Sequence, residues 1–538
     1  MKQNNFLKSI ILSAGVLFFA SCSKKLDLFP STGVTSETVF TNMQGYNQAM
    51  AKVYGSFGIQ GQPDLQGFDE GFSEFFREFW TMQELPTEEA VTAWGGADNV
   101  GLPDIHAMSW TSSNQYSSIL YYRCYAQITL CNNFVLESTD EKLSQRGITG
   151  ASADTVKYFR NEARFLRAYQ YWVLMDLFGN PSFVTETSIG SINLPKQISR
   201  KDLFTYIESE LKDIDAGLPP PRYSYGQADK AAAWALLARM YLNAEVYTGT
   251  PRYPDAITYA KKVIDAGYTL IPDYTQLMRA DNYKNTSEFI FPIKYDGRYS
   301  QSFGGSTFLQ ACASGGSMPV ALYGTGNKWA GFRTTSALVD KFQPSGSGQQ
   351  DLRGTQGSGI SNSFYTDGQS KQINDISSFT DGYGVIKYKN INRDGTPGSN
   401  QTFSDVDVPL FRLAEIYLIY AEATIRGGAG GDLTAAKGYL NKLRERAFNG
   451  NSGDFNDADM TMANIDATIL DERARELYWE GFRRMDLIRF GKFTGNNYVW
   501  PWKGGIKGGG GVADFRKLYP IPAAEINANT NLIQNTGY

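Results

Sequence analysis

The chain has 538 residues and a nearly balanced charge, with 51 basic residues against 55 acidic ones and a net charge of −4. This balance excludes the basic surface with which proteins bind nucleic acid. His106 is the only histidine, so a histidine-rich zinc site is excluded, and a Ser-His-Asp triad would need His106 itself, which we place in a loop after Pro103. Aromatic residues make up 14% of the chain, more than a core alone requires, so we expect some of them to form an exposed binding surface.

The first residues predict export. Lys2 and Lys8 flank a short apolar run, Ile10–Ala20, which is about half of the ~20 residues that cross a bilayer. We therefore expect a signal peptide over residues 1–21 and no transmembrane helix there. Cys22 directly follows small residues, as the lipidated cysteine of a bacterial lipobox does; the alternative is an ordinary cleaved signal with an incidental cysteine. Several acyl chains on Cys22 would tether the body stably to a membrane.

Several segments place apolar residues three to four positions apart, which predicts helices. The predicted helices before residue 270 are Ser36–Phe57, Asn114–Leu136, Asp154–Phe178, Ser199–Gly217, Asp229–Val246 and Tyr253–Gly267. Between the first two, Gln62–Ser109 has little regular period and is too long for a mere connection. Loops of that length in a compact domain are usually functional.

Two helix pairs have a tetratricopeptide-like spacing. The first matches that pattern at Trp234, Leu237, Ala238, Tyr241, Ala260, Ile264 and Gly267. A looser copy lies in Leu410–Ile425 and Leu433–Arg446, for which an ordinary helical hairpin is the alternative. Small residues at the crossings would let the helices of each pair approach closely, so we expect the pairs to stack.

Between the two pairs, Glu288–Val408 is rich in glycine, serine and tyrosine, with short β-like runs at Phe289–Ile293 and Val385–Tyr388. We predict an irregular region inserted into a helical scaffold. A last helix is predicted over Ala463–Phe490, followed by a second irregular stretch, Gly491–Lys517.

Three cysteines remain besides Cys22: Cys124, Cys131 and Cys312. They are too few for a disulfide scaffold. Cys124 and Cys131 lie seven residues apart in a helical pattern, about 10 Å along its axis, which is too far for a disulfide. We expect buried free thiols.

Several motifs together resemble one known family. In chain order they are the lipobox with Leu26-Asp27-Leu28-Phe29-Pro30, Arg164-Phe165-Leu166-Arg167-Ala168-Tyr169, Leu413-Ala414-Glu415-Ile416-Tyr417-Leu418, Glu472-Arg473-Ala474-Arg475-Glu476-Leu477, Gly481-Phe482-Arg483-Arg484-Met485-Asp486, Tyr519-Pro520-Ile521-Pro522 and Gln534-Asn535-Thr536-Gly537-Tyr538. Through them the chain closely resembles the SusD/RagB family of glycan-binding outer-membrane lipoproteins.

The resemblance implies a mainly α, SusD-like fold in a single domain over residues 22–538. Four tetratricopeptide-like helix pairs would form a superhelical scaffold over about 36–287 and 409–491, with irregular glycan-binding regions and short strands over about 60–112, 288–408 and 492–518. It also implies a partner, a SusC-like TonB-dependent outer-membrane transporter, over which the lipoprotein sits as a lid.

The irregular stretches look most like those of the starch-binding founding member of that family. The resemblance places its aromatic arc on Trp94, Phe303 and Trp329, and its polar contacts on Asp69 and Arg77. Phe303 stands where that relative has a tyrosine, and Ala97 where it has an asparagine contact, so Asp98 or Asn99 is the candidate substitute. These departures keep α-glucan as the predicted ligand class, with α-1,6-linked dextran as an alternative to starch.

Other signals are weaker. Asn390-x-Asn392-x-Asp394-Gly395 imitates half of a calcium loop, but Gln401 stands where a bidentate glutamate should be, so we favour a tight Asp-Gly turn and no cofactor; a structural calcium has no further support. Lys503–Gly511 is glycine-rich but lacks the ending of a phosphate loop. Glu84, Glu88 and Glu89 are the best candidates for the carboxylate pair of a glycosidase, although solvated loop residues are the more common case.

We predict a non-catalytic, lipid-anchored protein of the outer membrane, exposed at the cell surface. It would bind α-glucan such as starch or maltooligosaccharides and deliver it to the transporter. A glycoside hydrolase and a helical adaptor that contacts only protein are the rival classes.

Overall fold

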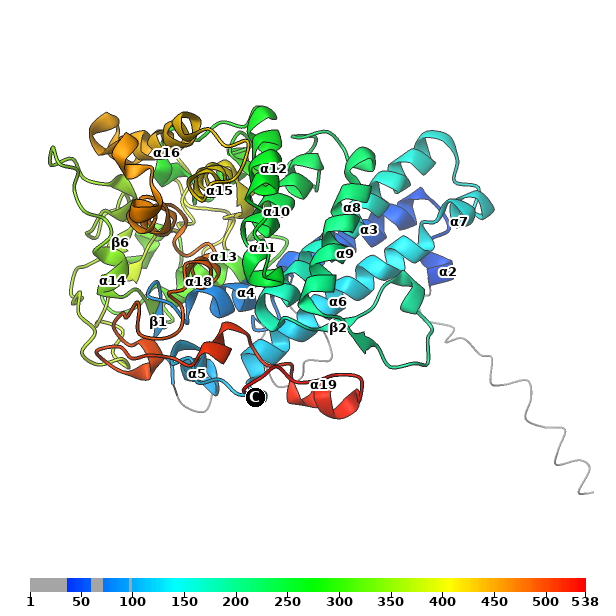
Figure 1. Cartoon of the computed structure of the whole chain (residues 1–538), viewed down its shortest axis with the longest axis horizontal. Coiled ribbons are helices and arrows are strands. Elements are labelled where there is room, and N and C mark those ends of the chain that lie inside the picture. Colours follow the sequence, from blue (N-terminus) through cyan, green and yellow to red (C-terminus); the bar gives the residue numbers. More distant parts are fainter. Residues whose placement is uncertain (1–35, 60–70, 96–98) are drawn as a thin grey trace, which may run out of the picture.

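The computed structural model describes residues 36–59, 71–95 and 99–538 (Figure 1). The predictions for the signal peptide, Cys22, Asp69 and Asp98 lie outside these residues. Within them, no helix combines the length and the apolar character that crossing a bilayer requires. The described chain is mainly helical with short strands, as the sequence predicted.

The longer helices are α3 (Met43–Gly58), α4 (Phe75–Glu84), α6 (Gln115–Glu137), α8 (Gly150–Phe178), α9 (Arg200–Asp213), α10 (Lys230–Leu242), α12 (Tyr253–Asp265), α13 (Gly305–Cys312), α15 (Leu413–Ile425) and α16 (Leu433–Phe448). The shorter ones are α2 (Ser36–Val39), α5 (Leu102–His106), α7 (Asp140–Gln145), α11 (Ala244–Thr248), α14 (Ser336–Val339), α17 (Asp471–Leu477), α18 (Arg483–Arg489) and α19 (Ala523–Ala528). In Figure 1, α2, α3, α6, α7 and α8 lie to the right, and α10 and α12 run down the middle. The loop-rich part, residues 288–408, lies to the left.

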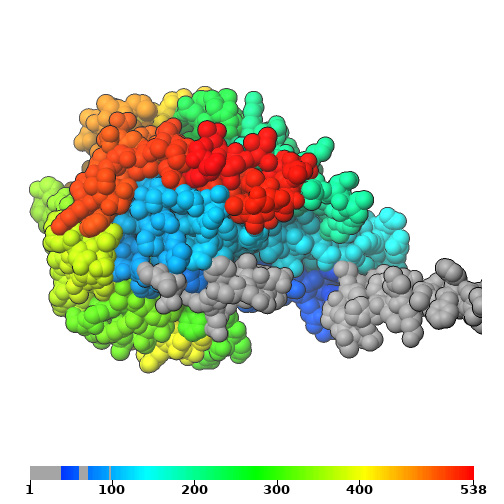
Figure 2. Space-filling view, turned by 90° about the horizontal axis from the view of Figure 1, so that it is seen from below, coloured from blue at the N-terminus to red at the C-terminus, as the bar shows by residue number. Residues whose placement is uncertain are grey.

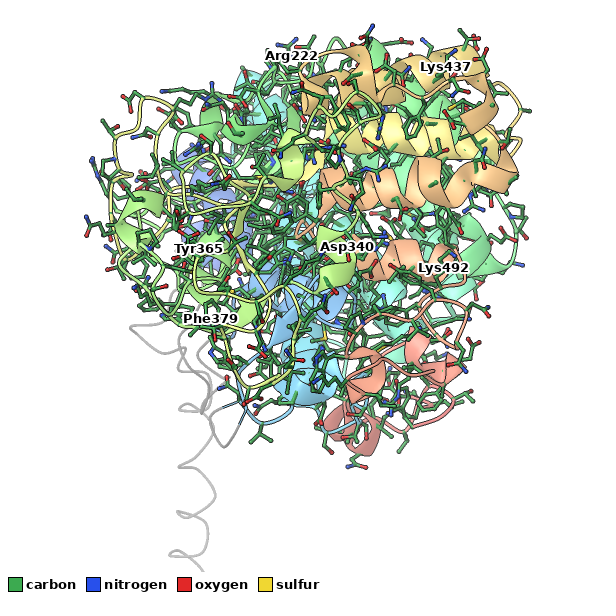
Figure 3. All side chains as sticks on the ribbon, turned by 90° about the vertical axis from the view of Figure 1, so that its left-hand side faces the viewer. Arg222, Asp340, Tyr365, Phe379, Lys437 and Lys492 are labelled. Atoms are coloured by element: carbon green, nitrogen blue, oxygen red, sulfur yellow. The ribbon has the colours of Figure 1, made fainter. Side chains whose placement is uncertain are left out.

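The strands form short antiparallel pairs and no extended sheet in the described residues. The pairs are β1 (Val91–Thr92) with β5 (Phe332–Arg333), β2 (Ser182–Phe183) with β3 (Lys196–Gln197), β4 (Phe289–Ile293) with β8 (Val408–Arg412), and β6 (Phe364–Tyr365) with β7 (Gly384–Val385). Figure 3 views the loop-rich side, where Asp340, Tyr365 and Phe379 lie among irregular segments while Lys437 and Lys492 lie beside helical ones.

The predicted helix pairs are present. α10 packs against α12, and α15 packs against α16. The side chain of Asp229 caps α10 by accepting a hydrogen bond from the backbone N–H of Ala232 at 3.1 Å. Ala235 and Ala238 of α10 are fully buried. The connection between α10 and α12 contains α11. Gly249, which follows α11, has the left-handed conformation (φ 77°).

Two helix predictions were wrong in extent. The first predicted helix is two, because the side chain of Asn42 caps a new start at α3 by accepting from the N–H of Gly45 at 3.1 Å. The helix predicted from Leu410 begins at Leu413, because Val408–Arg412 pairs as β8 with β4.

The predicted last helix, Ala463–Phe490, is also wrong: it is interrupted between α17 and α18. Trp479 (φ 62°) and Gly481 (φ 89°) leave the helical conformation there. Carboxylates from elsewhere satisfy the freed backbone: Glu84 accepts from the N–H groups of Gly481 (2.5 Å) and Phe482 (2.9 Å), and Glu89 accepts from that of Trp479 (3.0 Å). Tertiary hydrogen bonds have replaced helical ones at this point.

The segment Gln62–Ser109, predicted to be irregular, contains α4, β1 and α5 in its described part. Every residue of α4 is buried, including Arg77 and Glu78, so polar residues on its inner face hid the helical period. His106 lies in α5 rather than in a loop, and burial lowers its pKa to about 3. The imidazole is therefore neutral at physiological pH.

The C-terminal segment closes over the N-terminal half. Figure 2 shows the last residues, in red and orange, lying across early residues in blue. Tyr519 stacks on Trp110 at 4.3 Å between ring centroids and donates a hydrogen bond to the backbone oxygen of Met82 at 2.9 Å. Cys124, Cys131 and Cys312 are buried free thiols, as predicted.

A buried ion network joins the helices to the loop-rich part. Its members are fully or almost fully buried: Arg353, Arg412 and Arg446 with Glu288, Glu472, Glu476 and Glu480. Burial alone raises the pKa of Glu476, but Arg446, Arg412 and Arg353 together lower it to about 2. The motif around Glu472 and Glu476, recognised in the sequence, thus has a structural role.

We expect Arg412→Ala to lower the free energy of unfolding by about 3–5 kcal/mol, because it leaves buried carboxylates without their partner. Lys261→Ala, which removes an exposed pair with Asp265, is the control and should cost less than about 0.5 kcal/mol. Denaturant unfolding followed by circular dichroism measures both. Equal losses for the two variants would contradict the role given to the network.

Candidate functional site

Three half-buried aromatic rings lie in a row on the loop-rich part. The ring centroids of Trp94 and Trp329 are 6.4 Å apart, and those of Trp329 and Phe303 are 6.1 Å apart, with both pairs tilted by about 45°. The three residues lie far apart in the sequence, at positions 94, 303 and 329. The structure therefore brings together the three residues of the arc that the resemblance predicted.

Trp94 is held by a short strand pair. β1 and β5 align Thr92 with Phe332, and the N–H of Ala93 donates to the oxygen of Gly331 at 2.7 Å. The Trp94 indole N–H then donates to the backbone oxygen of Trp329 at 2.9 Å, and its ring packs on Phe332 at 5.2 Å. One tryptophan thus fixes the backbone that carries the other.

Helix α13 holds the backbone of Trp329. The last carbonyls of a helix have no partner within the helix. Here those of Ala311 and Cys312 accept from the N–H groups of Trp329 (3.0 Å) and Gly331 (2.8 Å). Ala330, between them, has a φ of 50°, a conformation rare for residues other than glycine, and it turns the chain so that both bonds form.

Phe303 precedes the start of α13, which Glu74 anchors. Glu74 accepts from the N–H of Gly305 at 2.8 Å and from the hydroxyl of Tyr295 at 2.7 Å, and it caps α4 by accepting from the N–H of Arg77 at 2.7 Å. A Cβ on Gly304 would lie 2.2 Å from that of Glu74, so this position admits only glycine. Burial raises the pKa of Glu74, and its hydrogen-bond donors oppose that rise.

Arg77, predicted to contact ligand, is 4% exposed. Its guanidinium carbon lies 4.3 Å from the ring centroid of Phe72 and 4.6 Å from that of Phe308. Cation–π contacts with these two rings give this side chain a packing role. A direct contact of Arg77 with ligand stays a prediction, as it does for Asp69 and Asp98.

Phe403 is a fourth ring that sequence reasoning missed. It is half-buried, and its ring centroid lies 4.9 Å from that of Phe303. Two hydrogen bonds join its loop to the one that leads to Trp329: the Asn327 side chain donates to the oxygen of Thr402, and the N–H of Gly326 donates to the oxygen of Gln401, both at 2.8 Å. A lone phenylalanine in a glycine- and serine-rich run was the only signal in the sequence.

Glu84, Glu88 and Glu89 are neither solvated nor accessible to a ligand, since each is at most 1% exposed. Glu88 binds Arg483 at 2.5 Å, and the other two hold the interrupted turn between α17 and α18. Burial raises the pKa of Glu84 to about 7, and burial together with the charge of Glu84 raises that of Glu89. This carboxylate cluster is structural, so the solvated interpretation was wrong and the cluster offers no pair across a sugar bond.

The imitation of a calcium loop is a tight turn, as we favoured. Asp394 accepts from the N–H of Thr396 at 3.0 Å, and Gly395 takes a φ of 86°. Among the described residues, no group of three or more His, Cys, Asp or Glu side chains is arranged to hold a metal ion.

Comparison with known proteins identifies the chain's relatives. The sequence model of the SusD family matches residues 356–538, and a second, described as "Starch-binding associating with outer membrane", matches residues 86–242. Among curated proteins, the starch-binding protein SusD of Bacteroides thetaiotaomicron is 39% identical over 98% of this chain and 97% of its own. The chain belongs to the SusD family. SusD-like protein P25 of Formosa agariphila is 22% identical over 99% of both chains.

Solved structures of the SusD superfamily share the fold. Surface glycan-binding protein A of Bacteroides fluxus matches with a TM-score of 0.70 and 20% identity over 92% of this chain and 99% of its own. The protein of the same name from Bacteroides thetaiotaomicron, solved in complex with laminarihexaose, matches with a TM-score of 0.66 and 20% identity over 91% and 98%. At this identity the match supports the SusD-like fold and no more.

Substitutions at two glycines near Trp94 test whether its indole ring is held in the position described. A Cβ on Gly331 would lie 2.4 Å from the indole ring, whereas one on Gly95 would meet nothing within 4 Å. We expect Gly331→Ala to change the near-ultraviolet circular dichroism of the tryptophans, and Gly95→Ala to leave it unchanged. Equal spectra for Gly331→Ala and the unmodified protein would show that Trp94 is not held as described.

Proposed function

We propose that this protein binds α-glucan, such as starch or maltooligosaccharides, on the row formed by Trp94, Trp329 and Phe303. The observation that carries this proposal is the continuity of the three half-buried rings, supplied by segments far apart in the chain. The 39% identity with a starch-binding relative along nearly the whole chain supports the choice of ligand class.

The geometry of the row suits a sugar chain. A glucose ring presents apolar C–H faces, which pack on aromatic planes. Successive ring planes are tilted by 43° and 46°, and we propose that these tilts follow the turn of a helical α-glucan. Asp69, Asp98 and Arg77 remain the proposed polar contacts to the hydroxyl groups.

We further propose that binding is not coupled to hydrolysis. The acidic cluster best suited to a glycosidase, Glu84, Glu88 and Glu89, is buried, and its carboxylates bind Arg483 and backbone N–H groups. A protein that captures glucan without cleaving it needs a route for its ligand. The proposed route is a SusC-like TonB-dependent transporter, with this protein tethered through Cys22 to the outer membrane at the cell surface.

Removal of one indole should weaken glucan binding without unfolding the protein. We expect Trp94→Ala and Trp329→Ala each to weaken binding of maltoheptaose at least tenfold, which corresponds to about 1.4 kcal/mol or more. Tyr223→Ala, which removes an exposed ring elsewhere, should leave the affinity unchanged. Calorimetry with starch, dextran, pullulan and laminarin measures the affinities and ranks the linkages.

Unchanged affinity for starch in both tryptophan variants would overturn the assignment of the site. Tight binding of dextran alone would replace the α-1,4 linkage with the α-1,6 linkage. Release of reducing sugar from starch by the purified protein would overturn the non-catalytic assignment.

The proposed anchor has its own test. We expect Cys22→Ala to move the protein from the membrane fraction to the soluble fraction, and Cys124→Ala, at a buried thiol, to leave it in the membrane fraction. Immunoblotting of fractionated cells gives the result. A Cys22→Ala protein that stays with the membrane would contradict lipid anchoring at this residue.

A further inference from the structure

A small cavity at the loop-rich part is lined by two buried lysines. Its walls are formed by Tyr274, Thr275, Met278, Ser361, Ser363, Lys387 and Lys389. It leaves about 10 Å³ for the centre of a water-sized sphere. That is room for a single water or a single small ion.

The two lysines differ in their partners. Lys387 donates to Glu480 at 2.6 Å and to the backbone oxygen of Tyr478 at 2.8 Å. Lys503, the third buried lysine of the described chain, donates to backbone oxygens, the nearest being that of Tyr498 at 2.7 Å. For Lys389, which is 3% exposed, the described residues supply neither a carboxylate within ion-pair range nor a hydrogen-bond acceptor for its Nζ.

The neighbourhood of Lys389 adds positive charge. Arg279 pairs with it in a β-bridge and is itself 6% exposed. Burial and, after it, the charge of Arg279 both lower the pKa of Lys389 well below its usual value, and a bound anion would oppose that lowering by favouring the ammonium form. A buried ammonium group is stable only when an opposite charge or several hydrogen bonds replace its lost hydration. Within the described part of the chain, protein atoms do not supply that replacement at Lys389.

We propose that this cavity binds a halide-sized monoanion, with chloride as the physiological ion. The Lys389 ammonium would supply the charge, the spare N–H of Lys387 and the hydroxyl of Ser361 would donate further hydrogen bonds, and Ser361 at the exposed rim gives access from solvent.

The anion would stabilise a segment that supports the aromatic row. The N–H of Lys389 donates to the oxygen of Met278 at 2.9 Å, and the N–H of Asn390 donates to the oxygen of Tyr323 at 2.8 Å. The Asn390 side chain also donates to the oxygen of Asn400 at 2.7 Å. Through these bonds the segment around Lys389 lies under both loops that lead to Trp329 and Phe403.

Bromide is the probe, because it resembles chloride and scatters anomalously. We expect crystals of the protein grown in sodium bromide to show an anomalous peak within hydrogen-bond distance of Lys389 Nζ. A cavity that contains only water at saturating bromide overturns the proposal, whatever the stability data show.

Thermal unfolding gives an independent readout. In sodium bromide or chloride, against sodium gluconate of equal ionic strength, we expect the midpoint to rise by about 2 °C in a saturable way, since only the folded state has the site. Lys389→Met should abolish this halide-dependent rise, whatever its effect on the midpoint itself. Lys503→Met, at a buried lysine that backbone oxygens satisfy, should retain it. An equal rise in Lys389→Met and the unmodified protein would overturn the proposal.

Discussion

The loop-rich part of this protein depends on buried charge that must be satisfied all at once. The carboxylate of Glu476, in α17, forms ion pairs with Arg353, Arg412 and Arg446. These arginines come from the loop-rich part, from the end of β8 and from α16. The strand pairs around them are two to five residues long, so backbone ladders contribute little. In such a network each unpaired member would cost far more than a lost surface contact, so arrangements of these segments that leave a member unpaired are disfavoured.

A chain of packed aromatic rings connects the buried charged residues with the aromatic row. The interruption between α17 and α18 places Trp479 against Trp80 at 4.9 Å, and Trp80 stacks on Phe332 at 5.3 Å. Phe332 in turn supports Trp94 at 5.2 Å. Because Glu84 and Glu89 hold the interrupted turn, the acidic residues that suggested catalysis instead position the ring surface. A packed scaffold behind a half-buried row of rings favours binding with little loss of conformational entropy.

Helical periodicity predicted α6, α8, α9, α10, α12 and α16 closely, since their apolar faces meet other helices. It failed where polar residues are buried: α4 carries Arg77 and Glu78 on inner surfaces, and the turn at Trp479 to Gly481 exchanges helical bonds for bonds to distant carboxylates. Resemblance to a family supplied Trp94, Phe303 and Trp329. Neither periodicity nor resemblance could find Phe403 or the burial of Arg77. These two features depend on contacts between loops, and a sequence pattern does not encode the path of a loop.

We propose that the row formed by Trp94, Trp329 and Phe303 is the surface that binds glucan. A crystal structure of the full chain with maltoheptaose tests it most directly. We expect successive glucose rings to lie on Trp94, Trp329 and Phe303, with the end of the glucan chain approaching Phe403. A maltoheptaose bound elsewhere, with these four rings left uncovered, would contradict it.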